Sequence, residues 1–272
     1  MLWEMVLVAL REIRRNVLRS SLTVLGIVIG VAAVITMVTL GSGVTAQVTA
    51  DISSLGTNLL DVRPGQGFHG PGGVRRESTP FEMEDAEAIA RDISGLSAVA
   101  PVASKPLQAI YGNENWSTTV TGSNNAYLLA RNWDLAAGRR FTYSELQSGK
   151  AVCILGATVR DKLFGAQDML GTSIRLGKLS CRVIGVFESK GQSSFGMDQD
   201  DFVLIPLRTL HRRIAGNQDV SAISVSAREG VSTDKVKRDI EQLMRERRRV
   251  SPGKDDDFHV RNMEELVGTM TS

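Results

Sequence analysis

The glycine-rich segment after the first predicted strand has the spacing of a nucleotide-binding motif. Gly65, Gly67 and Gly70 match the GxGxxG fingerprint of dinucleotide-binding proteins. That fingerprint requires a helix to begin at once, so that its N-terminus can meet the pyrophosphate. Here residues 71–73, Pro-Gly-Gly, extend the loop instead. We therefore interpret residues 64–73 as a loop and expect no bound dinucleotide.

Histidines and clustered aspartates are the next candidates, as metal ligands. His69, His211 and His259 lie far apart in the sequence, without cysteine or carboxylate neighbours at the spacing of a zinc site. The aspartates of residues 198–201 could indicate calcium, but the ordered glycine and the closing glutamate of an EF-hand loop are absent. We expect solvated turn carboxylates there and no metal site.

Residues for covalent or phosphate chemistry are also missing from the sequence. No Gly-Lys pair is followed by Ser or Thr, so there is no Walker A motif, and no Ser-His-Asp grouping or nucleophile elbow stands out. Cys153 and Cys181 fall in predicted strands, where either a disulfide or two small core side chains would explain them. We expect no catalytic residue and no cofactor, and any energy from ATP must come from another chain.

The segment Leu22–Gly41 contains twenty residues without a charge, preceded by arginines. Twenty helical residues cover the roughly 30 Å hydrocarbon core of a bilayer. The Leu, Ile and Val side chains together favour insertion by roughly 3 to 7 kcal/mol, and helical Thr hydroxyls can bond back to a carbonyl one turn earlier. We predict a transmembrane helix over residues 20–42. A cleaved signal peptide is the alternative, but its apolar region is usually shorter.

Basic residues on one side of this segment predict its orientation. The basic residues before it are Arg11, Arg14, Arg15 and Arg19, and the next one after it is Arg63. By the positive-inside rule, the N-terminus is cytoplasmic and everything beyond the helix is outside. Residues 1–19 have apolar positions at helical spacing, which favours an amphipathic segment at the cytoplasmic interface or a docking surface for a cytoplasmic partner.

Small residues line one face of the predicted membrane helix. Gly26 and Gly30 form a GxxxG pattern, and Thr23 and Ala33 extend it at helical spacing. Such a face lets two helix backbones approach closely in lipid. We interpret it as a packing face for helices that lie outside this sequence.

The remainder of the chain predicts an α+β outer domain in two parts. A net charge of +2 argues against a nucleic-acid binder. Two strand–helix–strand units on one sheet would form a ferredoxin-like porter part, whose halves we assign to residues 43–116 and 215–272. The expected elements are strand 58–62, helix 80–93 opened by a capping box at Thr79, strand 99–102, strand 222–227, helix 233–248 and strand 258–261.

Residues 117–214 predict a β-rich subdomain inserted between those halves. The expected elements are strands 151–155, 172–176, 179–187 and 202–205, helix 157–164, and a type II′ turn at Gly177–Lys178. The arginines of residues 245–249 end a helix and precede three aspartates, so we expect local charge balance and not an anionic partner.

Ordered sequence pieces resemble one known family along nearly the whole chain. The pieces are Ser21–Ile35, Leu55–Leu60, Gly138–Thr142, Val152–Gly156, Leu163–Gly165, Val183–Phe187 and Ile205–Leu207. They resemble the opening and the extracytoplasmic core domain of MacB-type ABC transporter permeases.

The resemblance implies an inner-membrane permease with one helix, a large periplasmic domain and then three more helices. It also implies a homodimer that works with an ABC ATPase subunit, and in many members beside a membrane-fusion adaptor and a TolC-like outer-membrane channel. The chain departs from this pattern because it carries no N-terminal ATPase domain and stops at Ser272, shortly before the expected second helix. The interpretation is a non-catalytic permease portion of an efflux transporter that transmits ATP-driven motion to the periplasm. A single-pass receptor with a ligand-sensing outer domain, and a related lipoprotein-releasing or cell-division permease, remain alternatives.

Overall fold

The computed structural model describes residues 17–55, 58–65, 79–165, 167–193, 198–251 and 253–262. The chain forms two compact units, Met1–Thr49 and Ala50–Ser272, and each is treated by itself. The basic residues Arg11, Arg14 and Arg15, the glycine-rich loop beyond Gly65, and the end of the chain after Asn262 lie outside the described residues.

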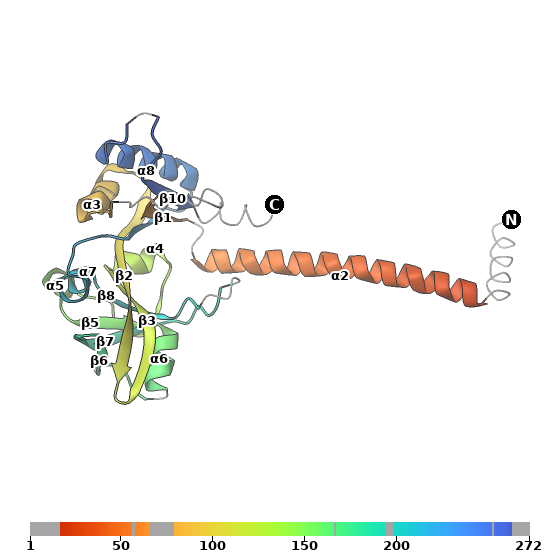
Figure 1. Ribbon diagram of the computed structural model, residues 1–272, viewed down its shortest axis with the longest axis horizontal. Coiled ribbons are helices and arrows are strands. Elements are labelled where there is room, and N and C mark those ends of the chain that lie inside the picture. The colour runs from red at the N-terminus through yellow and green to blue at the C-terminus, as the bar shows by residue number, and fades with distance from the viewer. Residues whose placement is uncertain are drawn as a thin grey trace. The chain divides into compact units, whose positions relative to one another are not determined.

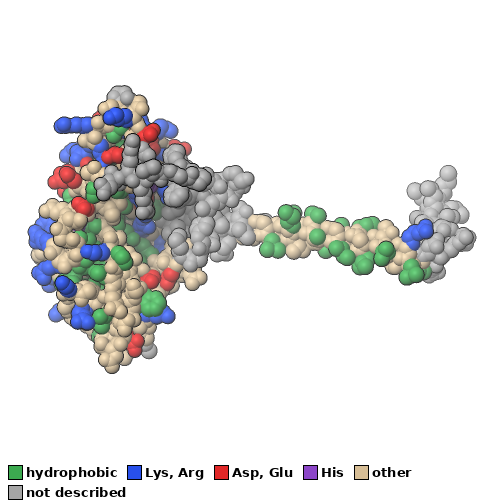
Figure 2. All heavy atoms as spheres, in the orientation of Figure 1, with side chains coloured by type: hydrophobic (Ala, Val, Ile, Leu, Met, Phe, Trp, Pro, Cys, Tyr) green, Lys and Arg blue, Asp and Glu red, His purple; other side chains and the backbone are tan. Residues whose placement is uncertain are grey.

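Helix α2, Val17–Leu55, is continuous over 39 residues. Its first 25 residues, Val17–Gly41, have a mean hydropathy of 2.5, and no part of that stretch is buried. By length and composition, it is the one helix among the described residues that could cross a membrane. Hydrophobic side chains lie along this whole stretch, and basic side chains appear only at its N-terminal end (Figure 2).

The porter part of the outer domain is built as the sequence predicts, from two strand–helix–strand units. The elements are β1 Leu59–Pro64, α3 Met83–Asp92, β2 Leu96–Tyr111, β9 Ala222–Ala227, α8 Thr233–Arg247 and β10 Phe258–Asn262. The strands are antiparallel neighbours in the order β10-β1-β9-β2, which is the ferredoxin-like order. The α+β fold class is confirmed.

Alternating side chains of β1 place an apolar row on one face of this sheet. Leu60 and Val62 are fully buried there, and they pack in one cluster with Ile89 of α3 and with Val236 and Ile240 of α8. Helices α3 and α8 lie together over that face (Figure 1). The opposite face carries Leu59 and Asp61, and residues of the inserted part, among them Ala130 of α4, pack on it.

Helix α3 begins later than the sequence predicts, so the capping box at Thr79 is wrong. Phe81 is instead held in an extended bridge with Val220, whose carbonyl accepts its N–H at 3.1 Å. The cap residue is Glu82, and its backbone N–H donates to Asp85 at 3.0 Å. Backbone pairing to a distant segment overrides the local start signal here.

The inserted part is mostly β, as expected. Its elements are β3 Glu114–Ser123, α4 Ala126–Ala130, β4 Leu135–Gly138, α5 Tyr143–Ser148, β5 Val152–Leu155, α6 Ala157–Phe164, β6 Ser173–Leu176, β7 Leu179–Phe187, β8 Phe202–Pro206, α7 Leu207–Leu210 and the π-helical turn His211–Ala215. The strand order continues as β2-β3-β8-β5-β7-β4, with β6 pairing β2 and β7. Positive φ occurs at Gly177 and not at Lys178, as the type II′ turn between β6 and β7 requires.

Strand β2 belongs to both parts of the domain. Its residues 96–102 pair with β9 in the porter sheet, and its residues 103–111 pair with β3 in the inserted part. Figure 1 shows β2 running from the α3 and α8 layer toward the far end of the domain. The two parts therefore share one continuous sheet, and the boundary at residue 117 assigned from the sequence falls within β3.

Candidate functional site

The small face of α2 is open along its length in the structure. Thr23, Gly26, Gly30 and Ala33 are all exposed, and a Cβ added at either glycine would meet no heavy atom within 4 Å. Arg19 is exposed near the N-terminal end of the helix. The face is free to pack against another helix, and its role as a packing face stays a prediction.

The residues that could have ligated metal do not come together. Among the described residues, no group of three His, Cys, Asp or Glu could hold a metal ion. His211 Nε2 lies 3.1 Å from the Asp219 carbonyl, and His259 Nδ1 lies 2.9 Å from the Gly65 carbonyl. Burial lowers the pKa of His211, which favours its neutral form. Each side chain therefore contacts a backbone carbonyl, His211 nearby in the sequence and His259 across the first and last strands of the porter sheet.

Of the aspartates in residues 198–201, Asp198 is exposed, as the sequence predicts, but Asp200 and Asp201 are not solvated turn carboxylates. Asp200 is 3% exposed and accepts the backbone N–H groups of Lys190 at 2.9 Å and Gly191 at 3.0 Å. Asp201 accepts the indole N–H of Trp116 at 2.9 Å. These carboxylates anchor the loop between β7 and β8. Their hydrogen-bond donors are distant in the sequence, so a short run of aspartates cannot predict the contacts.

The two cysteines are buried free thiols in one apolar cluster. Burial raises the pKa of the Cys153 thiol well above its usual value, so the reactive thiolate is disfavoured. The arrangement gives no activated nucleophile.

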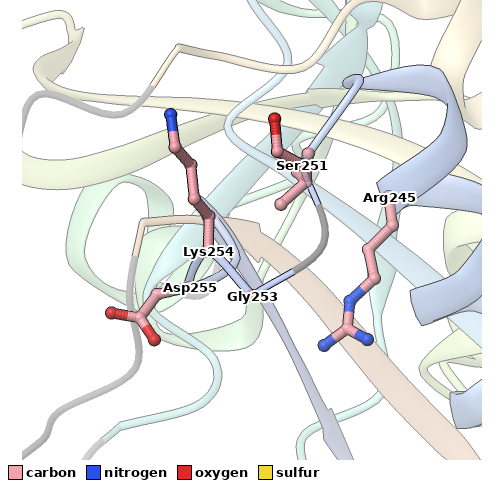
Figure 3. Close-up of a pocket in the computed structure, with 6 residues that line it drawn as sticks. Arg245, Ser251, Gly253, Lys254 and Asp255 are labelled. Atoms are coloured by element: carbon pink, nitrogen blue, oxygen red, sulfur yellow. The ribbon is translucent and has the colours of Figure 1, made fainter.

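Segment 245–255 borders a hollow of about 530 Å³. Figure 3 shows the charged ends of Arg245, Lys254 and Asp255 pointing in different directions and not converging. Arg245 is already bound to Asp256, with Nη2 to Oδ2 at 2.7 Å. The hollow has no convergent polar groups that would hold a ligand.

The arginine cluster at the end of α8 is balanced locally, as predicted. Arg247 pairs with Asp85 at 2.9 Å, and Arg248 pairs with Asp257 at 2.6 Å. Arg248 also donates to the Thr79 carbonyl at 2.8 Å. These contacts hold the end of α8 against α3 and the segment before it.

The segment Gly138–Thr142, one of the pieces that carries the family resemblance, has a structural explanation. At Gly138 φ is +88°, and an added Cβ would lie 2.2 Å from the Ile184 carbonyl oxygen. Arg139 donates to both oxygens of Glu145 at 2.8 Å. The hydrogen bonds and charge of Arg139, with the Thr142 backbone N–H, lower the pKa of Glu145 to about 2 despite its burial. The motif fixes a turn and the start of α5.

A polar cluster covers the face of the porter sheet opposite α3 and α8. Arg131, directly after α4, donates through Nη2 to Asp61 of β1, at 3.0 Å to Oδ1 and 2.8 Å to Oδ2. Ser224 of β9 donates to Asp61 Oδ1 at 2.7 Å, and its Oγ accepts from Arg131 Nε at 3.3 Å. We call these three residues the junction cluster, because they connect the inserted part to the porter sheet.

Burial and charge work against each other in the junction cluster, and charge prevails. Burial alone would raise the pKa of Asp61, but the Arg131 charge, the Ser224 hydroxyl and Arg63 together bring it below its usual value. Burial would lower the pKa of Arg131, but Asp61 keeps it above its usual value. The side chains of Arg131 and Asp61 are 23% and 17% exposed. Both remain charged, so the pair is an ion pair at any physiological pH.

The cluster is not arranged for catalysis. Ser224 is fully buried, so a substrate cannot reach its hydroxyl. Its hydrogen-bond acceptor is a carboxylate of lowered pKa, which is a weak base. The cluster can hold two parts of the domain together, and it has no feature that would activate a nucleophile.

Sequence reasoning missed the junction cluster. The one available signal was Asp61, a charge within the otherwise apolar strand Leu59–Val62. A charged residue at such a position needs a partner, but the partners lie 70 and 163 residues away in the sequence. Nothing local identifies them.

Comparisons with known proteins agree with this architecture. The family model described as the MacB-like periplasmic core domain matches residues 20–243. The "macrolide export ATP-binding/permease protein MacB" of Rhodospirillum rubrum is 39% identical over 94% of this chain and 38% of its own length. The protein of that name in an Azoarcus species is 36% identical over 97% of this chain and 39% of its own length. The chain thus spans less than half the length of these relatives.

Solved structures show the same fold. The periplasmic region of MacB from Actinobacillus actinomycetemcomitans superposes with a TM-score of 0.68 at 21% identity, over 80% of this chain and 95% of that one. The extracellular domain of YknZ, described as a noncanonic ABC-type transporter from Gram-positive bacteria, gives 0.59 at 22% identity, over 75% and 100%.

Proposed function

The chain belongs to the MacB-like periplasmic core domain family, and from this premise we propose that it is the N-terminal portion of an ABC-type efflux permease. The observation that carries the proposal is the continuous family match over residues 20–243, from the apolar helix through the inserted part and into α8 of the porter part. In this proposal, α2 is a transmembrane helix of the inner membrane, with its N-terminus cytoplasmic and the outer domain periplasmic. The chain transmits motion and catalyses no reaction.

Energy enters from a separate ABC ATPase subunit in this proposal. The relatives are named as ATP-binding/permease proteins, whereas this sequence contains no Walker A motif. An ATPase can shift the permease only by binding its conformations with different affinity. The complete permease would act as a homodimer, beside a membrane-fusion adaptor and a TolC-like channel.

Calorimetry and an efflux assay together test the proposal. The purified chain should show no saturable ATP binding, and cells that lack the gene should accumulate more of a macrolide probe than complemented cells. Binding of ATP that is abolished by replacing Gly65 and Gly67 with alanine would contradict the proposal that a separate subunit binds the nucleotide. Equal macrolide accumulation in both strains would contradict macrolide efflux.

Thiol labelling tests the orientation. Single cysteines at Ser42 and at Asn16, with Cys153 and Cys181 replaced by alanine, should differ in reaction with an impermeant reagent on intact spheroplasts. We expect labelling at position 42 only. Labelling at position 16 alone would invert the topology.

The small face of α2 can be tested separately from folding. Because an added Cβ at Gly26 or Gly30 meets nothing within 4 Å in this chain, isoleucine at both positions should leave the chain folded and inserted. Efflux should fall if the face packs against another helix. Ala32→Ile, on another face of the same helix, is the matched control. Equal efflux in both variants would mean that the face contacts only lipid.

A further inference from the structure

Helix α4, in the inserted part, contacts β2 and β9 on the face of the porter sheet opposite α3 and α8. Ala130 shares a small apolar cluster with Leu59 of β1. On the other side, the Tyr127 ring lies 6.4 Å from the Phe202 ring of β8. Apolar residues of α4 therefore pack against both parts of the domain. Such contacts are non-directional, so they do not by themselves fix the position of α4 relative to the porter sheet.

The junction cluster adds direction to this contact. Arg131 reaches Asp61 on β1 and Ser224 on β9 through different guanidinium nitrogens, so a shift of α4 along the sheet would break at least one bond. Hydrogen bonds with a charged partner have strict geometry and are roughly twice as strong as neutral ones. Sliding of α4 would leave the largely buried Asp61 carboxylate with only its longer contact to Arg63, at 3.4 Å.

The backbone of Arg131 is tied to the inserted part as well. Lys190 donates through Nζ to the Arg131 carbonyl at 3.0 Å, and its ammonium lies 4.7 Å from the centre of the Trp133 ring. The backbone N–H of Lys190 donates to Asp200, the buried carboxylate that precedes β8. A continuous set of polar contacts thus runs from β1 through Arg131 to the loop before β8.

Strand β1 is the first strand after the membrane helix, since α2 ends at Leu55 and β1 begins at Leu59. We propose that Arg131 is a positioning residue: its side chain fixes the inserted part to β1, so that displacement delivered along α2 moves both parts of the outer domain as one body. The role in transport rests on the proposed function, whereas the attachment itself is measurable without transport.

Spin-label distances in the whole 272-residue chain in nanodiscs test the attachment. Cysteines replace Arg238 on α8 and Lys178 in the turn between β6 and β7, which are both exposed, while the native thiols are buried. The unmodified junction should give one narrow distance distribution. Arg131→Gln should at least double its width, and Arg131→Lys, which keeps the charge but loses the contact with Ser224, should give an intermediate width.

Arg245→Gln is the matched control, because it removes an arginine–aspartate pair that closes within the porter part. Its distribution should equal that of the parent chain. Where Arg131→Gln fails to fold, Ser224→Ala provides the same test with both charges retained. An unchanged width in folded Arg131→Gln, or in Ser224→Ala in its place, would overturn the proposal.

Efflux by cells separates this proposal from the proposed function. Arg131→Lys should lower efflux at least threefold at equal protein abundance, while Arg245→Gln should not. A broadened distance distribution with full efflux would overturn the transport role of Arg131. No efflux by the parent protein would count against the proposed function and would leave the distance result decisive for the attachment.

Discussion

Helix α2 and the outer domain satisfy their polar side chains in opposite ways. In α2, the hydroxyls of Thr23, Thr36 and Thr39 each donate to the carbonyl four residues earlier, at 2.7 to 2.9 Å. In the outer domain, Asp61 has one long contact with the nearby Arg63, at 3.4 Å, but its short hydrogen bonds come from residues 70 and 163 positions away. These hydroxyl bonds close within the helix, so in the proposed membrane setting they need no polar partner from another element.

Non-local satisfaction has a different consequence. The partners of Asp61 come from separate elements, so the bonds form only when those elements are in their correct relative positions. Removing one partner leaves a largely buried charge uncompensated, which is costly. Removing a partner of a buried polar side chain in the outer domain should therefore lower the free energy of unfolding, whereas removing a threonine hydroxyl from α2 should not.

The largest expected effect is that of Arg131→Gln. It leaves Asp61, at 17% exposure, with only the longer ion pair to the exposed Arg63 at 3.4 Å, and we expect a loss of about 2–4 kcal/mol in the free energy of unfolding, at or just below the range for fully buried pairs. Denaturant unfolding of the chain in detergent measures it. A loss no greater than that of Arg245→Gln would remove the distinction between the two ion pairs.

Ser224→Ala should have the next largest effect. It removes the hydroxyl that donates to Asp61 and accepts from Arg131 Nε, and an unsatisfied buried donor costs about 1–3 kcal/mol. Ser226→Ala, on the same face of β9, is the matched control because its hydroxyl only contacts the Ala227 carbonyl at 3.4 Å. Equal losses in the two variants would show that position on β9, and not the cluster, determines the cost.

Acid should weaken the outer domain through its paired carboxylates. The pKa of Glu145 is about 2 in the fold, below its ordinary 4.5, so its contribution is complete above pH 4.5 and is lost as pH falls toward 2. We expect a loss of about 1 kcal/mol, after allowing for solvent screening at the half-exposed Arg139. Asp61 adds to the slope in the same direction. Glu145→Gln should flatten the curve of unfolding free energy against pH, and an unchanged slope would contradict this.

Thr36→Val should have the smallest effect. Its hydroxyl bonds only to the Ala32 carbonyl, which also accepts the ordinary helical N–H, so no other element loses a partner. The change in unfolding free energy of the outer domain should stay within about 0.5 kcal/mol. A larger loss would mean that α2 and the outer domain share a cooperative unit.

Periodicity was sufficient to predict much of the fold. Strand β9, helix α6 and strand β7 begin and end where the sequence indicates, because apolar residues alternate with serine in β9, Gly165 follows α6, and the turn at Gly177 precedes β7. The sequence also predicted the type II′ turn at Gly177, because that turn needs positive φ only at its first central position, where glycine stands.

Long-range pairing accounts for what the sequence did not reveal. The full extent of β2, the start of α3 after the Phe81–Val220 bridge, and the parallel pairing of β3 with β8 all depend on segments distant in the chain. Arg131 carried no local signal at all.

A double-mutant cycle between Asp61 and Arg131 tests most directly whether this pair fixes the two parts of the outer domain together. The unfolding free energies of the parent chain, Asp61→Asn, Arg131→Gln and the double variant give the coupling between the two side chains. The expected coupling is at least about 2 kcal/mol, with the double variant less impaired than the sum of the single ones. Costs that add to within about 0.5 kcal/mol would contradict it, because the two charges would then act independently.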